Sequence, residues 1–492
     1  MNINDSFRFL NYGLPEDILR YKLAGDFASA IRLIDYRLKD SSLPAGMKGA
    51  LEVQKIICRL LPGEFPYTIE EALEIVRKNI PDYTLAELWE LIDSRYVRWI
   101  YVDGEVHIFN RFYSSICKSV PGFAQRAGVK MHGVESAASG TKEDSRLDVC
   151  MRKMKSSGSM TNRIRIRATL RLKDEFFTPG MFLRVHLPIP KACPQQENIQ
   201  IERVFPENGI LSPEDASQRT ICWEGNFAEN PEFLVEYSYL HTARYTPAYD
   251  GTGLTGRYDF DLSEQPPHIV FTPYIRALCD ELTKGLTDPL EKVRAFYNYI
   301  TCNMHYTFMP SYVVLENISE LCAMNYTGDC GVFALLLITL CRCAGIPAQW
   351  QSGLTAEPDF IGGHDWVRFY VEPYGWLFAD PSYGTAAVRA GSEERRQFYF
   401  GNLDPYRMVA NSAFYENFTI PKLQWRADPY DNQLGEIETA DRGFTFDEYS
   451  RTKEVYEMDE NSLVCSQVEK EVTAAGQEEV KPVHEKAITG KS

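Results

Sequence analysis

The sequence predicts an α+β protein of several domains: a helical N-terminal region, a β-sandwich, and a region that mixes helices and strands. At 492 residues the chain is too long for one typical domain. Its hydrophobic fraction of 44% is that of a globular protein with sizeable cores. The spacing of apolar residues changes along the chain from three or four positions to strict alternation, and then to a mixture of both.

Charge and composition narrow the possible partners. The net charge of −16 argues against nucleic acid as a main partner, because binding to phosphates needs a basic surface. The N-terminus lacks the pattern of a secretory signal, and no apolar stretch reaches 18 residues, so we expect no membrane partner and a cytoplasmic location. The twelve cysteines include no CxxC pair, so we expect free thiols, no metal and no cofactor. Oligomeric state is not predicted.

Residues 1–125 are predicted to be mostly helical. The segments 68–80 and 84–97 each begin with a threonine that can cap a helix, and Asp103-Gly104 marks a hairpin turn after them. Two helices followed by a hairpin resemble a winged helix. Because the second segment is acidic, we expect protein contact or scaffolding here rather than DNA binding.

The remaining boundaries follow from changes in pattern. Residues 126–160 are rich in serine, glycine and charge, which predicts a linker. Residues 161–250 begin with RIRIRATLRL, whose alternation predicts an antiparallel β-sandwich with a solvated row of arginines. An anion-binding face is the less favoured interpretation of that row. Residues 251–440 mix helices and strands, and the polar residues 441–492 are predicted to form a disordered acidic tail.

The stretch NYTGDCGVFALLLITLCRCAG, residues 325–345, places Cys330 after a Gly-Asp turn and before an apolar run. The run predicts a buried helix, with Cys330 at its N-terminus and Gly331 leaving space beside the thiol. The helix dipole is expected to lower the pKa of such a thiol and favour a nucleophilic thiolate. A structural thiol or a metal ligand are the alternatives.

A nucleophilic thiolate needs a base, and the base needs an orienting group. His364 and Asp380 lie 16 residues apart on two predicted antiparallel strands, which would bring them side by side. Asp365 is a weaker candidate for the orienting acid, because its side chain should point to the opposite face from that of His364. Trp366 should share the face of His364, where it could line a cleft.

Two segments, GDCGVFALLLITLCRCAGIPAQWQSG and GGHDWVRFYVEPYGWLFADPSYG, resemble the bacterial-type transglutaminase-like superfamily, which has a papain-like core. The resemblance implies that Cys330 is the nucleophile, His364 the base and Asp380 the orienting carboxylate. It also implies an oxyanion hole formed by the Cys330 backbone N–H and one upstream side chain. Candidates for the oxyanion hole or the cleft are Tyr306, Asn325, Tyr326, Gly331 and Trp366.

The resemblance implies a cysteine-dependent acyl-transfer enzyme that acts on a protein or peptide. We expect it to hydrolyse an amide or peptide bond through a thioester. A protein-glutamine transglutaminase, which passes the acyl group to an amine, is one alternative. A catalytically inactive binding or scaffolding protein is the other.

Overall fold

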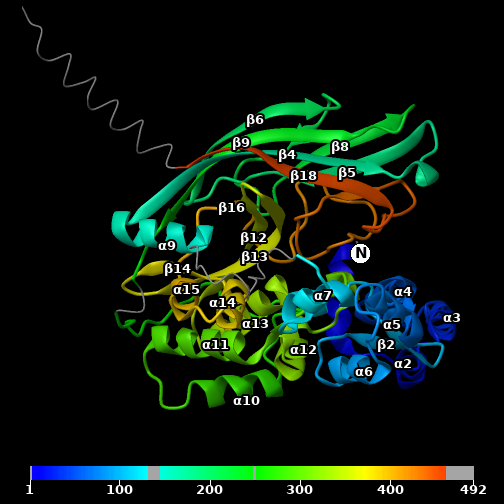
Figure 1. The fold of residues 1–492 in the computed structure, drawn as a ribbon. Helices are drawn as coiled ribbons and strands as arrows, with labels where there is room; N and C mark the ends of the chain where they lie inside the picture. The colour runs from blue at the N-terminus through cyan, green and yellow to red at the C-terminus, as the bar shows by residue number, and fades with distance from the viewer. Residues whose placement is uncertain (1–2, 131–144, 248–250, 461–492) are drawn as a thin grey trace, which may run out of the picture.

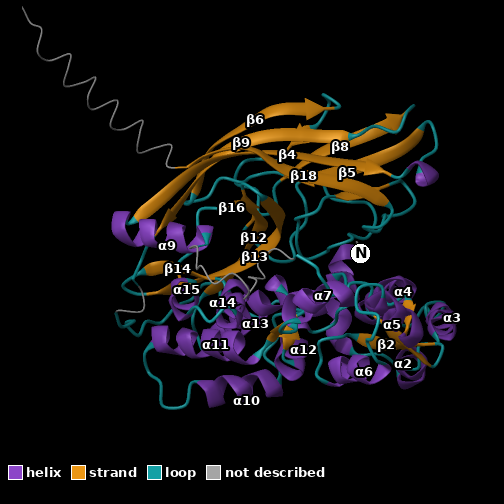
Figure 2. Ribbon diagram, in the orientation of Figure 1, coloured by secondary structure: helices purple, strands orange, loops and turns teal. Residues whose placement is uncertain are grey.

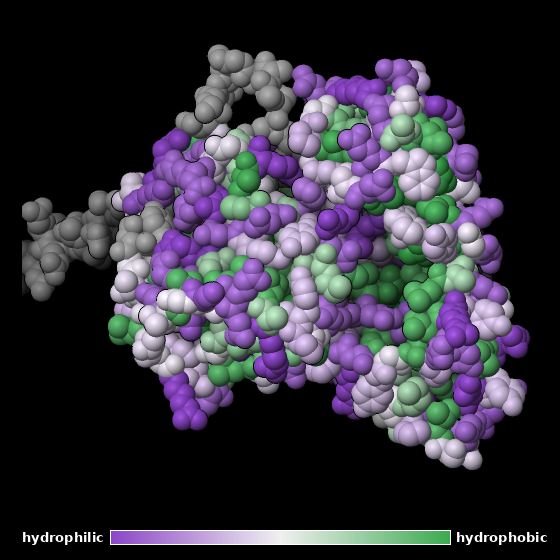
Figure 3. Space-filling view, turned by 90° about the horizontal axis from the view of Figure 1, so that it is seen from below, coloured by the Kyte–Doolittle hydropathy of each residue, from purple (hydrophilic) through white to green (hydrophobic). Residues whose placement is uncertain are grey.

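The computed structural model describes residues 3–130, 145–247 and 251–460 (Figure 1). Helices gather on one side of the molecule and long strands on the other (Figure 2). Hydrophilic side chains cover much of the face seen from below, which is hollowed in one place between apolar side chains (Figure 3). Within the described residues, no helix is both long enough and apolar enough to cross a bilayer.

The N-terminal region is helical, as predicted. Its elements are α1 (Ile3–Ser6), the 3-10 helix η1 (Phe7–Tyr12), α2 (Glu16–Leu23), α3 (Phe27–Arg37), α4 (Ala45–Glu64), β1 (Tyr67–Thr68), α5 (Ile69–Arg77), α6 (Leu85–Asp93), β2 (Trp99–Val102), β3 (Glu105–Ile108), α7 (Phe112–Ser119) and α8 (Phe123–Arg126). Thr68 and Thr84 cap α5 and α6 through capping boxes, and β2 and β3 form the predicted hairpin.

This region does not stand apart from the rest of the chain. Phe7, Ile18 and Leu51 belong to the same hydrophobic core as the helix that begins at Cys330. A second, smaller core joins α5 to α8 and contains Leu88 and Ile116. The first helices are therefore packed on the region that carries the candidate nucleophile.

The linker predicted for residues 126–160 is wrong for its last part. Residues Arg146–Ser157 form helix α9, whose N-terminus has a capping box of Ser145 and Asp148. Gly158 ends the helix with a φ of 77°. Cys150 and Met154 lie on the buried face of α9. A few apolar residues on one face therefore suffice to pack this otherwise polar helix against the rest of the protein. Residues 131–144 lie outside the described residues.

Two four-stranded antiparallel sheets follow. Their elements are β4 (Ser159–Leu172), the 3-10 helix η2 (Asp174–Phe176), β5 (Met181–Pro188), β6 (Gln196–Phe205), β7 (Ile210–Leu211), β8 (Thr220–Phe227), β9 (Phe233–Arg244), β17 (Glu436–Glu438) and β18 (Tyr449–Glu460). The strand orders are β17-β5-β8-β7 and β18-β4-β9-β6. Residues of both sheets, such as Ile164 and Trp223, share one hydrophobic core.

The predicted disordered tail is wrong for residues 449–460, which form the edge strand β18 against β4. Arg167 Nη1 lies 2.8 Å from Glu454, and Arg165 pairs with Glu457. The arginine row of β4 therefore meets acidic side chains of the C-terminal segment. The opposite charges of the two segments are visible in the sequence. They come into contact only because two strands almost 300 positions apart pair with each other. Residues 461–492 lie outside the described residues.

The remaining elements form the mixed region. They are α10 (Pro273–Leu282), α11 (Pro289–Asn303), β10 (His305–Tyr306), the 3-10 helix η3 (Tyr312–Val314), α12 (Ile318–Asn325), β11 (Thr327–Gly328), α13 (Cys330–Cys343), β12 (Ala348–Glu357), β13 (Phe360–Val371), β14 (Gly375–Ala379), α14 (Pro381–Arg389), α15 (Glu393–Phe398), β15 (Phe400–Gly401) and β16 (Arg407–Asn411). The antiparallel sheet has the order β15-β14-β13-β12-β16. Helix α13 is buried along nearly its whole length and packs against β12 and β13, as its apolar sequence predicts.

Candidate functional site

Cys330 is the first residue of helix α13, as predicted. Asp329 caps the helix by accepting the N–H of Val332 at 3.2 Å, and it also accepts the hydroxyl of Tyr312. Just before it, β11 pairs with β10 in parallel, with Gly328 opposite Tyr306. The thiol residue is only 9% exposed. The turn chemistry around Cys330 therefore fixes its position at the edge of a buried core.

The hydrogen-bond partner of the thiol is Asp365. Cys330 Sγ lies 3.2 Å from Asp365 Oδ2, and the other oxygen of this carboxyl group accepts a hydrogen bond from Gln433 Nε2. A Cβ atom at Gly331 would lie 2.8 Å from Asp365 Oδ2. The glycine therefore makes the approach of this carboxyl group possible, which is the role of leaving space that its position predicts.

The pKa of the Cys330 thiol is raised well above its ordinary value. Burial is the largest cause, and the neighbouring carboxyl groups of Asp365 and Asp329 add to it. The prediction that the helix N-terminus lowers this pKa is therefore wrong. Loss of hydration and two groups of like charge outweigh the partial charge of the helix end. In the arrangement described, the thiol is protonated at neutral pH.

His364 and Asp380 form the predicted pair. His364 Nε2 lies 2.7 Å from Asp380 Oδ2, and both side chains are buried. Asp380 also caps α14 by accepting the N–H of Tyr383 at 2.9 Å. Burial opposes ionisation of Asp380, but the charges of His364 and Arg407 hold its pKa below the ordinary value. The hairpin between β13 and β14 brings the two residues together, as their spacing indicates.

Arg407 extends this pair into a closed network. Its Nη1 lies 2.8 Å from Asp380 Oδ2 and its Nη2 lies 2.6 Å from Asp404 Oδ2. Trp366, beneath the guanidinium, is fully buried, so the prediction that it lines a cleft is wrong. Sequence reasoning missed Arg407 and Asp404. Their spacing of three residues was visible, but their contact with Asp380 depends on strand β16.

Cys330 and His364 lie on opposite sides of strand β13. Val367 and Phe369 face helix α13, so Asp365, two residues before Val367, shares that side. His364 lies on the reverse side, where its ring centroid is 6.1 Å from that of Trp366. In the part of the chain that the structure describes, no hydrogen bond joins Cys330 to His364. Asp365 does point to the opposite face from His364, as predicted, but that face is the one that meets the thiol.

The other cleft candidates are placed unequally. Burial is the main cause of the raised pKa of Tyr306, and the nearby charge of Cys330 adds to it. Asn325 donates to the carbonyl of Leu321 at the end of α12, at 2.8 Å. Tyr326 ends that helix with a φ of 57° and packs under Arg95. Of these three residues, only Tyr306 interacts electrostatically with Cys330.

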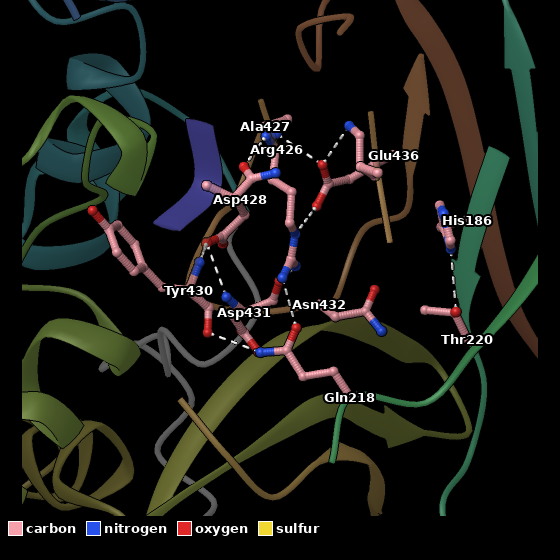
Figure 4. Close-up of polar contacts among 12 residues, drawn as sticks. His186, Gln218, Thr220, Arg426, Ala427, Asp428, Tyr430, Asp431, Asn432 and Glu436 are labelled. Atoms are coloured by element: carbon pink, nitrogen blue, oxygen red, sulfur yellow. Dashed lines mark hydrogen bonds and ion pairs between the residues drawn. The ribbon is translucent and has the colours of Figure 1, made fainter. Parts of the chain in front are cut away.

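The polar segment of residues 426–436 contacts Asp365 through the side chain of Gln433. Figure 4 shows Arg426 between Glu436 and Gln218, with Asp428 and Asp431 beside it. Asp431 Oδ1 accepts from Asn411 Nδ2 at 2.7 Å. Burial and the neighbouring Asp431 raise the pKa of Asp365, and they raise that of Asp428 to about 7. Within the described ranges, no three His, Cys, Asp or Glu side chains are arranged to hold a metal ion.

Comparison with known proteins finds a family similarity in the region that contains this site. Residues 276–381 match the family model of the transglutaminase-like superfamily, and this range contains Cys330, His364, Asp365 and Asp380. A protein-glutamine gamma-glutamyltransferase of Pseudomonas aeruginosa is 28% identical over 175 residues, which are 33% of this chain and 24% of that protein. An uncharacterized protein of Bacillus subtilis, YebA, is 26% identical over 129 residues, which are 22% of this chain and 17% of that protein.

Solved structures are similar to parts of the chain at low identity. A candidate cysteine protease from Cytophaga hutchinsonii is 15% identical, with a TM-score of 0.41, covering 61% of this chain and 89% of that one. The periplasmic domain of TgpA from Pseudomonas aeruginosa is 15% identical, with a TM-score of 0.26, covering 50% of this chain and 96% of that one. The chain matches about a quarter or less of the length of its curated relatives. The similarity of the chain to the transglutaminase-like superfamily therefore lies in residues 276–381, which the family model matches.

Proposed function

We propose that this protein is a cysteine-dependent acyl-transfer enzyme that hydrolyses an amide or peptide bond. The observation that carries the proposal is the cysteine at the start of buried helix α13, inside the transglutaminase-like match. Its sulfur attacks the amide carbonyl carbon, the C–N bond breaks, and the amine leaves with a proton. Water then hydrolyses the thioester, which releases the acid and restores the thiol.

The thiol must lose its proton before it attacks, and two groups compete for this role. The family pattern assigns the proton to His364, oriented by Asp380. Asp365 is the group in contact with Sγ, at 3.2 Å, and needs no movement to receive the proton. Transfer to His364 requires the start of β13 to turn its other face to Cys330. Gly362 and Gly363, which directly precede His364, give the backbone conformational freedom at this point.

Two further functions remain as alternatives. A protein-glutamine transglutaminase would share the attack by Cys330 and differ only in the acceptor, an amine in place of water. Hydrolysis is proposed because water reaches any open site, whereas an amine acceptor needs a binding place of its own. A catalytically inactive binding protein is favoured by one observation, the 9% exposure of a protonated Cys330 that does not touch His364.

The test is turnover of p-nitrophenyl acetate by the full chain, with mass spectrometry to locate the acetyl group. Cys343 supplies a matched control, because a hydrogen bond from Cys279 lowers the pKa of its thiol to about 7. Turnover that is abolished by Cys330→Ser and retained by Cys343→Ser supports the proposal. Turnover that is equal in the wild type and in Cys330→Ser overturns it and favours the inactive binding protein.

A second substrate separates hydrolysis from amine transfer. With N,N-dimethylcasein and monodansylcadaverine, Cys330-dependent formation of new amino termini, or release of ammonia without incorporation of the amine, supports hydrolysis. Incorporation of the fluorescent amine, with one ammonia released for each amine incorporated, supports the transglutaminase alternative. His364→Ala and Asp365→Asn then assign the proton acceptor, since the variant that lacks it should lose turnover while keeping its fold.

A further inference from the structure

Three cations, Lys118, Arg111 and Arg389, interact with Tyr306 or its neighbour Phe308, close to the candidate nucleophile. Lys118 Nζ lies 4.1 Å from the centroid of that ring, and Arg111 packs 3.7 Å from the neighbouring ring of Phe308. Arg389, at the end of α14, interacts electrostatically with Tyr306. Within the described residues, none of the three cations forms an ion pair. This is notable in a chain with 68 acidic and 52 basic residues, where acidic partners are in excess.

The cations are held in place by contacts between the N-terminal region and the mixed region. Helix α7 docks on strand β10, where Ser115 Oγ accepts the N–H of Phe308 at 3.0 Å and Ser119 Oγ donates to the carbonyl of Tyr306. Arg389 Nη1 lies 3.4 Å from the same Ser119 Oγ. Strand β10 pairs with β11, which ends two residues before Cys330. Figure 1 shows α7 where the two regions meet.

The charges of this cluster act on the nucleophile. Burial lowers the pKa of Lys118 to about 8, Cys330 and Asp329 act to raise it, and Arg389 and Arg111 act to lower it. These five groups therefore share one local field. Burial raises the pKa of the opposing carboxyl group, Asp365, well above its ordinary value, which weakens the negative charge on that side of Cys330. The side of Cys330 that faces α7 is therefore positive.

We propose that Lys118, Arg111 and Arg389 bind a carboxylate of the substrate next to the amide that Cys330 attacks. The substrate class is then an acidic peptide, or an amide flanked by a terminal carboxylate. This inference rests on the proposed function and gives the N-terminal region a role, since α7 supplies one wall of the substrate site. A carboxylate would supply the ion-pair partner that these cations lack within the described residues. Its desolvation cost would be smallest at Lys118, which is already partly removed from water.

The test compares two alkylating reagents of similar size, iodoacetate and iodoacetamide, at Cys330. The ratio of their rates at one pH does not depend on the fraction of thiolate, so it reports the local preference for a negative charge. We expect this ratio to be higher at Cys330 than at the exposed Cys302. It should fall about fivefold in Lys118→Met, the order expected for one unit charge at a partly wet surface, and much less in Lys118→Arg.

The control is Lys78→Met, which removes an exposed cation from the same region and should leave the ratio unchanged. Methionine keeps the apolar stem that packs on Tyr306, and a thermal unfolding curve checks that the variant is folded. A ratio at Cys330 equal to that at Cys302, or unchanged in Lys118→Met, overturns the proposal while leaving the nucleophile intact. A Cys330 that reacts with neither reagent overturns the proposed function and this inference with it.

Protection of Cys330 from iodoacetamide separates the two sources of a carboxylate. The probes are acetyl-Glu-Ala-amide, acetyl-Ala-Ala with a free carboxylate, and acetyl-Ala-Ala-amide. Protection by the first probe supports a side-chain carboxylate, and protection by the second supports a terminal one. Equal protection by all three, or by the neutral probe alone, overturns the proposal.

Discussion

The two faces of strand β13 hold ionisable groups in opposite ways. On the reverse face, His364, Asp380, Arg407 and Asp404 alternate in sign, and the pKa values of both carboxyl groups are lowered. On the face toward α13, Cys330 meets Asp365, and Asp428 and Asp431 add two further carboxyl groups whose pKa values are raised. The first arrangement stabilises the fold. The second costs stability and leaves groups that can exchange protons.

The paired face is the reverse side of β13, where His364, Asp380, Arg407 and Asp404 form ion pairs. Removing one of these ion pairs should give the largest loss of stability. Arg407 and Asp380 are fully buried and Asp404 is nearly so. Arg407→Met leaves two buried carboxylates without their shared cation, so the free energy of unfolding should fall by about 3–5 kcal/mol. Urea unfolding followed by circular dichroism measures this fall.

Arg203→Met is the control for that measurement. Arg203 is 60% exposed and lies 3.8 Å from Glu236, so its loss should cost less than about 1 kcal/mol. Equal losses in the two variants would contradict the view that the paired face stabilises the fold.

The unpaired face is the side of β13 toward α13, with the carboxyl groups of Asp365, Asp428 and Asp431. It should gain stability when one of these carboxyl groups is made neutral. Burial and Asp431 raise the pKa of Asp428 to about 7, above its value in the unfolded chain. Its contribution to stability is fully present below the unfolded pKa and is lost as the pH rises through the folded one. Asp428→Asn removes that loss, so the variant should gain about 4 kcal/mol over the wild type between about pH 4 and about pH 8, since one pKa unit corresponds to about 1.4 kcal/mol.

Urea unfolding of both proteins across this pH range measures the gain. Asparagine keeps an oxygen that can accept the N–H groups of Tyr430 and Asp431, which lie 3.0 Å and 3.1 Å from Asp428 Oδ1. A difference between the two proteins that does not change with pH would show that Asp428 is ionised in the folded state.

Local sequence predicted much of the site. The caps at Thr68 and Thr84, the helix that begins at Cys330, and the pairing of His364 with Asp380 each depend on short stretches or on one hairpin. The face of β13 that meets Cys330 could also have been predicted. The apolar residues Val367 and Phe369 must cover the buried helix α13, and this places Asp365 on the same side.

Other parts depended on contacts between distant segments. Arg407 reaches Asp380 from β16, and β18 finds its place through charges on β4. Gln433 touches Asp365 from a segment without regular structure. Such contacts leave no periodic pattern in the sequence, because each one is fixed only when the sheets have been assembled.

Removing the charge of Asp365 should sharpen the contrast between the two faces. The carboxyl group is one cause of the raised pKa of Cys330. Asp365→Asn should therefore lower this pKa and speed alkylation of Cys330 by iodoacetamide about tenfold at about pH 7.5. His364→Ala, on the reverse face, should change that rate less than about twofold. If His364→Ala instead abolishes labelling, His364 reaches the thiol in solution.

The smallest effect is expected from Gln433, which covers the unpaired face. Its amide donates to Asp365 Oδ1, and its Oε1 would lie 2.2 Å from a Cβ atom at Gly363. Gln433→Ala opens the space above Asp365 and removes one hydrogen bond, so Cys330 should react with iodoacetamide about threefold faster. Gln397→Ala is the control, because Gln397 Nε2 also donates to a carboxylate, that of Glu393 at 2.7 Å, in an exposed hydrogen bond on helix α15. Equal rates in the two variants would show that reagent reaches Cys330 by another route, past Tyr306 and the cations of α7.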